Sequence, residues 1–199
     1  MQHYPPDSAR FPDAASVLRF WFGEPPEYGM RRKRWFEKDP AFDAQVRGMF
    51  SELHRALGGG AHREWLETRA DCLAYIVAAD QFPRHLYRGE ARAFSTDALA
   101  LDAARVALER GFEPALLPVE RLFVCLPFQH SENLDDQRLA CRLAEPLGAF
   151  PETEEVPRYA LAHRDIVQRF GRFPHRNAAL GRPSTPEEIE FLRLPGSSF

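Results

Sequence analysis

Apolar residues recur along the chain at spacings of three and four, the period of one face of an α-helix. The clearest stripe follows Asp39 and Pro40, a good N-cap and a proline suited to the first helical position. Its members are Phe42, Val46, Met49, Phe50, Leu53 and Leu57, and three consecutive glycines follow it. No segment alternates between apolar and polar positions as a half-buried strand does. The pattern therefore predicts an all-α protein.

The same periodicity predicts a series of helices separated by turns that contain glycine and proline. They lie near residues 14–22, 40–57, 64–82, 96–110, 118–126, 132–147, 157–170 and 186–193. Helices of this length with short connections favour antiparallel pairs, stacked as a bundle or a short superhelix. We expect residues 1–13 to form a loose lead-in and residues 14–199 to form a single all-helical domain.

Composition narrows the class of protein without identifying a ligand. The chain has 199 residues, of which 44% are hydrophobic and 28% charged, as in a soluble domain with a substantial core. Its net charge of -3 gives no reason to expect a nucleic acid or an anionic membrane as partner. No apolar run approaches the ~20 residues of a membrane span. The polar first ten residues lack the apolar core of a signal peptide, which favours the cytoplasm.

The cysteines and histidines give little support for a disulfide or a metal centre. Three cysteines without a CxxC motif, standing in apolar helical patterns, favour buried free thiols; they are Cys72, Cys125 and Cys141. The side chains that could hold a metal are His130, Glu132, His163 and His175. Because no HExxH or HxH pattern joins them, we predict no metal site. The sequence indicates no particular cofactor.

Candidate chemistry is concentrated in three stretches that each combine phenylalanine and proline with polar residues. They are residues 80–84, continuing to 87–89, residues 127–132, and residues 170–177. We predict that they converge on one site, with 170–177 at its centre. Pro83 disfavours helical geometry at the preceding residue, so a helix should end or kink there. Asp80 would then lie near a helix C-terminus, where the helix dipole disfavours a carboxylate, and such a conflict marks a functional or ion-paired residue.

Within these stretches, the arginines indicate an anion and the histidines a proton carrier. Arg172, His175 and Arg176 would form a cradle for phosphate or carboxylate, with Arg84 contributing, because guanidinium groups donate paired hydrogen bonds. Histidine titrates near neutrality, and Asp80 or Glu132 could orient it. The candidate catalytic residues are His130, His175 and Asp80; the candidate ligand-binding residues are Arg84, Arg88, Gln81, Glu132, Arg172, Arg176 and Asn177. His163 lies on an apolar stripe and is interpreted as a core histidine.

Several short blocks occur in a fixed order along most of the chain, from about residue 15 to 193. They lie at residues 18–22, 80–84, 87–89, 93–97, 127–132 and 170–177. In these blocks the chain resembles the DUF924 family. The resemblance implies an all-helical, tetratricopeptide-like fold and no established activity or catalytic residues. His85 stands where the family often has Asn, and Gln129 where it often has Glu. The second difference weighs against a mechanism that needs a carboxylate next to His130.

Three kinds of function stay open on the sequence alone. The first is an enzyme or sensor acting on a small anionic ligand, phosphorylated or carboxylate. The second is a tetratricopeptide-like scaffold that binds a peptide or protein partner in a groove. The third is a structural polar core in which arginines satisfy the carbonyl groups at helix ends. A deep pocket lined by Arg84, Arg172 and His175 would favour the first kind, and an open groove with exposed aromatic residues the second.

Overall fold

The computed structural model describes residues 11–197, which form helices and turns and contain no strand. The α-helices are α1 (Ala14–Phe22), α2 (Pro40–Gly58), α3 (Arg69–Asp80), α4 (Phe82–Leu86), α5 (Asp97–Glu109), α6 (Pro118–His130), α7 (Leu134–Ala144), α8 (Val156–Phe170) and α9 (Pro186–Leu192). Short 3-10 helices connect them: η2 (Lys33–Trp35), η3 (Arg63–Glu67), η4 (Ala91–Phe94), η5 (Glu113–Ala115), η6 (Glu145–Ala149), η7 (Pro151–Thr153) and η8 (Pro174–Arg176). The predicted all-α class is confirmed.

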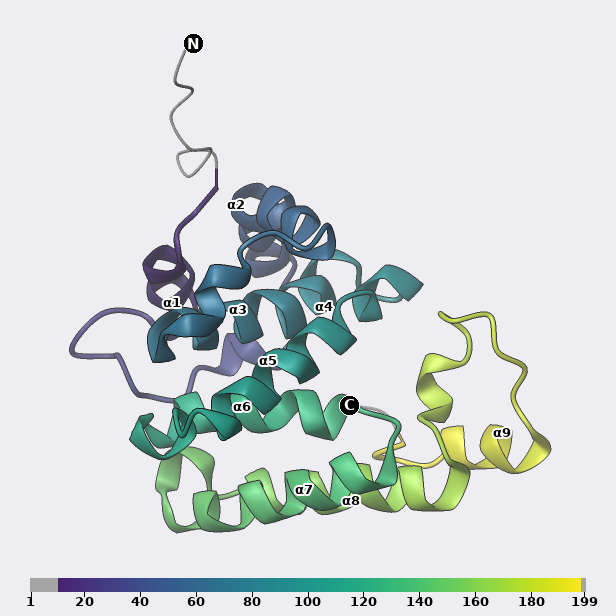
Figure 1. Cartoon of the computed structure of the whole chain (residues 1–199). Helices are drawn as coiled ribbons and strands as arrows, with labels where there is room; N and C mark the ends of the chain where they lie inside the picture. The colour runs from purple at the N-terminus through teal and green to yellow at the C-terminus, as the bar shows by residue number, and fades with distance from the viewer. Residues whose placement is uncertain (1–10, 198–199) are drawn as a thin grey trace.

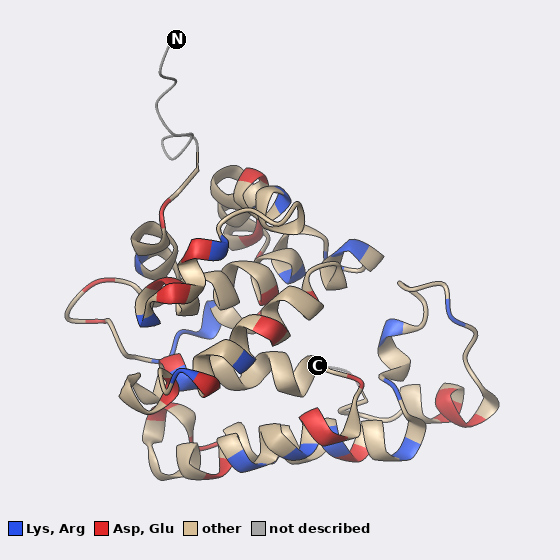
Figure 2. Ribbon diagram, viewed as in Figure 1, with Lys and Arg blue, Asp and Glu red and all other residues tan. Residues whose placement is uncertain are grey.

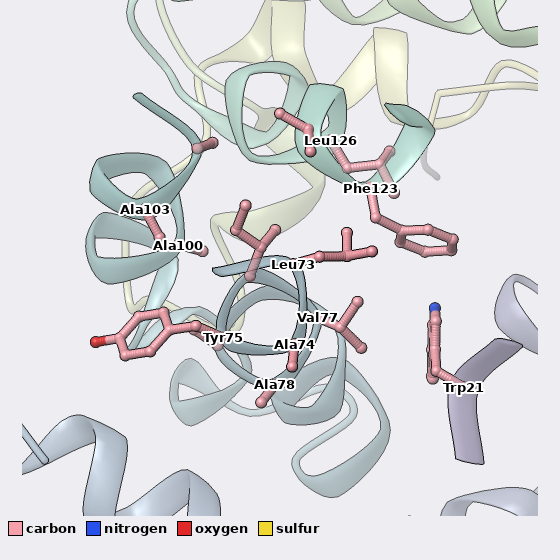
Figure 3. Close-up of a cluster of buried hydrophobic side chains, with 14 of the residues drawn as sticks. Trp21, Leu73, Ala74, Tyr75, Val77, Ala78, Ala100, Ala103, Phe123 and Leu126 are labelled. Carbon is pink, nitrogen blue, oxygen red and sulfur yellow. The ribbon is translucent and has the colours of Figure 1, made fainter. Parts of the chain in front are cut away.

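Helix α3 forms the centre of the main core and contacts α1, α2, α4, α5 and α6 (Figure 1). All its residues from Cys72 to Asp80 are buried. Figure 3 shows Trp21 of α1, Ala103 of α5 and Phe123 of α6 approaching α3 from three directions. The face of α5 toward the core consists of alanines, which leave little bulk between the two helices; they are Ala100, Ala103, Ala104 and Ala107. Asp80 therefore ends a helix that is surrounded by other helices.

The second half of the chain extends the fold away from α1 and α2 (Figure 1). Helix α6 contacts α5 on one side and α7 and α8 on the other, and α7 packs along α8. A separate small cluster of buried residues, Ile166, Val167 and Phe173, joins the end of α8 to the following segment. Consecutive helices are thus neighbours in space, whereas a tetratricopeptide-like repeat stays a prediction.

The helix expected over residues 64–82 is divided at two points. Thr68 accepts a hydrogen bond from the Asp71 N–H at 3.3 Å and caps α3, so that the preceding residues form η3 instead. At the other end, α4 begins immediately after Gln81, with Pro83 in its first turn. A proline at the start of a helix has no hydrogen bond to lose, so Pro83 opens a new turn.

The helix expected over residues 118–126 continues through Pro127 to His130. A proline inside a helix removes one backbone hydrogen bond, but the residues around it, Leu126 and Phe128, are buried in the core. The extension puts His130 at the end of a core helix instead of in a loop. Asn133 caps α7, because its Oδ1 accepts the N–H of Asp135 at 2.8 Å.

The outer surface of the described residues carries both signs of charge. Figure 2 shows lysines and arginines interspersed with aspartates and glutamates over most helices. None of the helices between residues 11 and 197 has the length and apolar content needed to cross a lipid bilayer.

Candidate functional site

A cavity of about 540 Å³ borders the ends of α3 and α6, together with α4, α8 and η8. A volume of this size is typical of sites for small molecules. Its apolar lining residues are Trp35, Phe36, Ala93, Phe94, Leu122, Leu126 and Val156. Its polar lining residues are Arg31, Glu37, Gln81, Arg84, His85, Arg88, Gln129, His130, Tyr159, His163, His175 and Arg176. Binding sites for small molecules usually combine apolar walls with polar groups that point toward the ligand.

Asp80 and His130 form a hydrogen-bonded pair at the wall of this cavity. Nδ1 of His130 lies 2.7 Å from Oδ1 of Asp80, whose side chain is 1% exposed. Burial opposes ionisation of Asp80, but the charge of Arg84 and the contact with His130 outweigh it and hold the pKa of Asp80 below its usual range. Because an ionised carboxylate only accepts hydrogen bonds, the shared proton is on Nδ1 and leaves Nε2 of a neutral His130 without a proton.

Asp97, the first residue of α5, lies between two arginines of the cavity wall. Its carboxylate accepts two hydrogen bonds from Arg84, at 2.9 and 3.3 Å, and one from Arg176 at 3.3 Å. Arg84 also donates to the carbonyl oxygen of Asp80 and lies 3.5 Å from the Asp80 carboxylate. Two carboxylates therefore balance two guanidinium groups in this cluster. The hydrogen-bonding groups of Arg84 are largely occupied within the protein.

Arg176 is less completely paired than Arg84 although it is only 7% exposed. Its guanidinium lies 4.7 Å from the ring centres of both Phe94 and Phe173. Among the described residues, its side chain donates one hydrogen bond, to Asp97, and its buried Nε has no partner. Burial and the neighbouring charge of Arg84 lower the pKa of Arg176 to about 10, so it stays a cation at neutral pH. Most donors of this buried guanidinium are thus not used by residues 11–197.

Two further histidines of the wall are uncharged at neutral pH. Burial lowers the pKa of His163 to about 3 and that of His175 to about 4, and the positive charge of Arg176 contributes to the shift at both. Nδ1 of His163 donates to the Tyr159 carbonyl oxygen at 2.8 Å, which anchors the ring to α8. The His163 ring centre lies 6.3 Å from that of His130. The imidazoles therefore add polar but neutral surface to the cavity.

A second aspartate–histidine pair holds α4 to α2. Nδ1 of His85 lies 2.7 Å from Oδ1 of Asp43, and Arg88 donates to the same carboxylate at 2.9 Å. The His85 ring packs edge-on against Trp21 and Phe42 of the core. Arg88, which the sequence placed among the ligand-binding candidates, borders the cavity but is paired with Asp43.

The remaining predicted residues belong to a network beside the cavity, which joins the segment after α8 to the turn between α6 and α7 and to α9. Glu132 accepts hydrogen bonds from Arg182 at 2.7 and 2.9 Å and from the Phe173 N–H at 2.8 Å. Arg172 donates to Glu188 at 2.7 and 2.8 Å, and Asn177 donates to the same carboxylate at 3.2 Å. We call this network the clamp. Its members are Glu132, Arg172, Asn177, Arg182 and Glu188.

The structure thus brings together part of the set that the sequence suggested. The cavity wall contains Gln81, Arg84, Arg88, His130, His175 and Arg176, with Asp80 behind His130. It does not contain Arg172, Glu132 or Asn177. Arg172 lies outside the cavity lining and pairs with Glu188, 16 residues further along the chain.

Sequence reasoning missed Asp97 and the role of Gln129. Asp97 lies in the block at residues 93–97, but no local pattern marks it as a partner of Arg84 and Arg176. Gln129 donates to Cys125 Sγ at 3.3 Å and not to His130. The carboxylate partner of His130 comes instead from α3, so the glutamine at 129 leaves this pairing intact. Between residues 11 and 197, no cluster of three or more His, Cys, Asp or Glu residues is suited to a metal ion.

Fold and site together define an all-helical protein with a buried charged cluster beside a small-molecule-sized cavity. Residues 17–196 match the family DUF924, described as bacterial protein of unknown function, and the chain belongs to this family. The chain is also similar to the solved structure of a protein of unknown function from Agrobacterium tumefaciens. The two are 41% identical with a TM-score of 0.80, over 90% of this chain and 96% of that chain. Comparison with curated proteins gave no match.

Proposed function

We propose that the cavity binds a small organic anion, a carboxylate or a phosphate, that carries an apolar body. The observation that carries this proposal is Arg176, a buried cation whose side chain makes one hydrogen bond with the described residues. A buried charge is stable only when it is paired and its donors are satisfied. A bound anion would supply the missing acceptors.

The stacking of Arg176 supports a pre-formed site. Phe94 and Phe173 hold the guanidinium plane from two elements, η4 and the turn before η8, so little side-chain freedom is lost on binding. Asp97 accepts two hydrogen bonds from Arg84 and only one from Arg176, so Arg176 keeps donors for a further acceptor. Because Asp80 and Asp97 already offset the charges of the two arginines, a head group with a single negative charge suits the site best.

The rest of the lining supports an apolar body for the ligand. Trp35, Leu122, Leu126 and Val156 offer apolar surface in the same cavity. Burial of such surface contributes roughly 25 cal/mol per Å² of apolar area removed from water. A small aromatic carboxylate or phosphomonoester combines the two requirements, whereas inorganic phosphate meets only the first.

A thermal-shift experiment tests the proposal with benzoate, phenyl phosphate and the neutral benzamide. At ~100 times its dissociation constant, a ligand should stabilise the fold by about 2.7 kcal/mol. We expect benzoate or phenyl phosphate, but not benzamide, to raise Tm. The Arg176→Met variant should fold, since Arg84 still pairs with Asp97, and should lose the response.

Arg172→Met is the matched control, because Arg172 is paired with Glu188 outside the cavity lining. It should keep the wild-type response to the anions. If neither anion raises Tm, or if Arg176→Met responds like the wild type, the anion site is refuted.

A peptide-binding scaffold is the second candidate, favoured by two aromatic residues of the cavity lining. Phe36 is 49% exposed and Tyr159 39% exposed, so both rings present apolar surface to solvent beside the cavity. A peptide side chain could insert between them. Substitution of Phe36 and Tyr159 by alanine would abolish peptide capture but leave the Arg176-dependent response to benzoate unchanged, which separates the two candidates.

A further inference from the structure

We infer that Asp80 and His130 form a proton-transfer pair that acts beside the anion bound at Arg176. Nε2 of His130 takes a proton from an O–H group of that anion or of an adjacent water molecule, and Asp80 stabilises the resulting imidazolium. The O–H bond breaks, an N–H bond forms, and the electron pair stays on the oxygen. His130 is the catalytic residue and Asp80 its positioning residue. The identity of the neighbouring ligand rests on the proposed function.

The orientation of His130 supports this role. Its Nδ1 is held by Asp80, and its Nε2 makes no hydrogen bond with any described residue. Nε2 is also not one of the buried nitrogen atoms without a partner, and the side chain, 14% exposed, lines the cavity. A basic nitrogen that borders a ligand cavity and whose tautomer is fixed by a carboxylate is the arrangement of a general base.

The carboxylate behind His130 is itself buried and held in place by two neighbouring side chains. Gln81 donates to Oδ2 of Asp80, Arg84 lies beside Oδ1, and the residue is 1% exposed. Such a fixed, desolvated carboxylate orients the imidazole and favours its protonated form without moving during the proton transfer. Burial and the charge of Arg84 lower the pKa of His130, which keeps the free residue in the basic form at pH 7.

Two other histidines of the cavity wall, His85 and His163, are less suited to the role. His163 is 6% exposed, and its Nδ1 donates to a backbone carbonyl oxygen, which provides no negative charge to stabilise an imidazolium. His85 has a carboxylate partner, but Asp43 is shared with Arg88 and the ring is packed into the core at 4% exposure. These two residues serve as internal references for His130.

The first test is the tautomer of His130, measured by ¹⁵N NMR of the imidazole nitrogens at pH 7. Wild type should show a neutral ring with the proton on Nδ1. In Asp80→Asn, the side-chain oxygen should remain toward the Gln81 donor and the new amide N–H should face Nδ1. The ring should then change to the Nε2–H tautomer. A wild-type Nε2–H tautomer, or no change in the variant, would overturn the inference.

The second test needs only the wild-type fold and uses alkylation at pH 6.5, with peptide mapping by mass spectrometry. Neutral bromoacetamide should alkylate Nε2 of His130, where the nitrogen displaces bromide, in preference to His85 and His163. Absence of the modification at His130, or modification of His85 instead, refutes the proton-transfer pair. N-acetylhistidine, alkylated under the same conditions, provides the intrinsic rate of an unperturbed imidazole.

Bromoacetate, a charged reagent, tests the anion site at Arg176 separately from the Asp80–His130 pair. Relative to N-acetylhistidine, it should react with His130 about tenfold faster than bromoacetamide, the effect of one charge-assisted contact with Arg176. In Arg176→Met the advantage should disappear while the bromoacetamide rate persists. Equal rates in the wild type would refute the anion site and leave the pair standing.

Discussion

Nδ1 of His130 lies 2.7 Å from Oδ1 of Asp80, and the two residues are the last of α6 and of α3. The contact therefore joins two helix C-termini, where backbone carbonyl groups give a partial negative charge. Arg84 offsets this charge, because it donates to the Asp80 carbonyl oxygen and lies beside the Asp80 carboxylate. An aspartate that the helix dipole disfavours is thus stabilised by one arginine and one histidine.

Removal of the Asp80 carboxylate should destabilise the fold strongly. Asp80→Ala leaves Arg84 with Asp97 as its remaining carboxylate and opens a buried polar space, a change that typically costs about 3–5 kcal/mol. Urea denaturation at pH 7 measures the loss. Asp102→Ala is the control, because Asp102 is 71% exposed and its pair with Arg105 should contribute less than ~1 kcal/mol. A loss below ~1 kcal/mol for Asp80→Ala would contradict the buried pair.

The buried histidines predict that stability falls as pH decreases from neutrality. Burial lowers the pKa of His54 and His175 to about 4 and that of His163 to about 3, whereas the unfolded residues titrate near 6.5. Between these values the unfolded chain binds protons that the folded chain does not. Each histidine therefore contributes a slope of up to about 1.4 kcal/mol per pH unit, with stability present above pH ~6.5 and lost below it.

Denaturation at pH 7.5, 6.5 and 5.5 measures this slope. The charged or titratable groups that act on His163 are His130, Arg176 and His175, and Arg92 acts on His54. Those that act on His175 are Arg176, His130, Glu132 and Arg182. His163→Leu should flatten the slope, because it removes one titrating group. A free energy of unfolding that is constant over this range would refute the prediction.

The close approach of α3 and α5 should not tolerate a larger side chain. Ala103 is fully buried against α3, so Ala103→Leu should cost about 1–3 kcal/mol through overpacking. Ala98→Leu, on the exposed face of the same helix, should change stability by less than ~0.5 kcal/mol. Tm values of the two variants provide the comparison, and equal values would show that the alanine face is not required.

Glu188 should control the local stability of the chain after α8. Its carboxylate accepts from Arg172, Asn177 and the Thr185 N–H, and the hydrogen bond from Arg172 lowers its pKa to about 2. Glu188→Ala should raise amide hydrogen exchange over residues 171–192 by about tenfold or more and leave α3 unchanged. Glu187→Ala removes only an exposed pair with Arg169 and is the control. Unchanged exchange in Glu188→Ala would show that the clamp is not required.

Much of the fold could be predicted because its signals are local. The stripe from Phe42 to Leu57 and the Asp39 cap define α2, and Thr185 with Glu188 three residues later forms a capping box at the start of α9. The predicted boundaries failed at Thr68, which caps α3, and at Pro127, where the sequence shows the lost hydrogen bond but not the surrounding core. Pro127 remains inside α6 because its neighbours are buried, which no local pattern reveals.

By itself, the sequence determined the helical class, most helix positions and the stretches that carry polar chemistry, because these depend on residues a few positions apart. Only the tertiary structure decided which charges meet. Arg176 contacts Asp97 across 79 positions and His130 contacts Asp80 across 50, whereas Arg172, in the same stretch as Arg176, turns to Glu188. An arginine attracts any carboxylate with similar strength, so helix packing rather than residue type selects the partner and thereby assigns each side chain to the cavity or to the clamp.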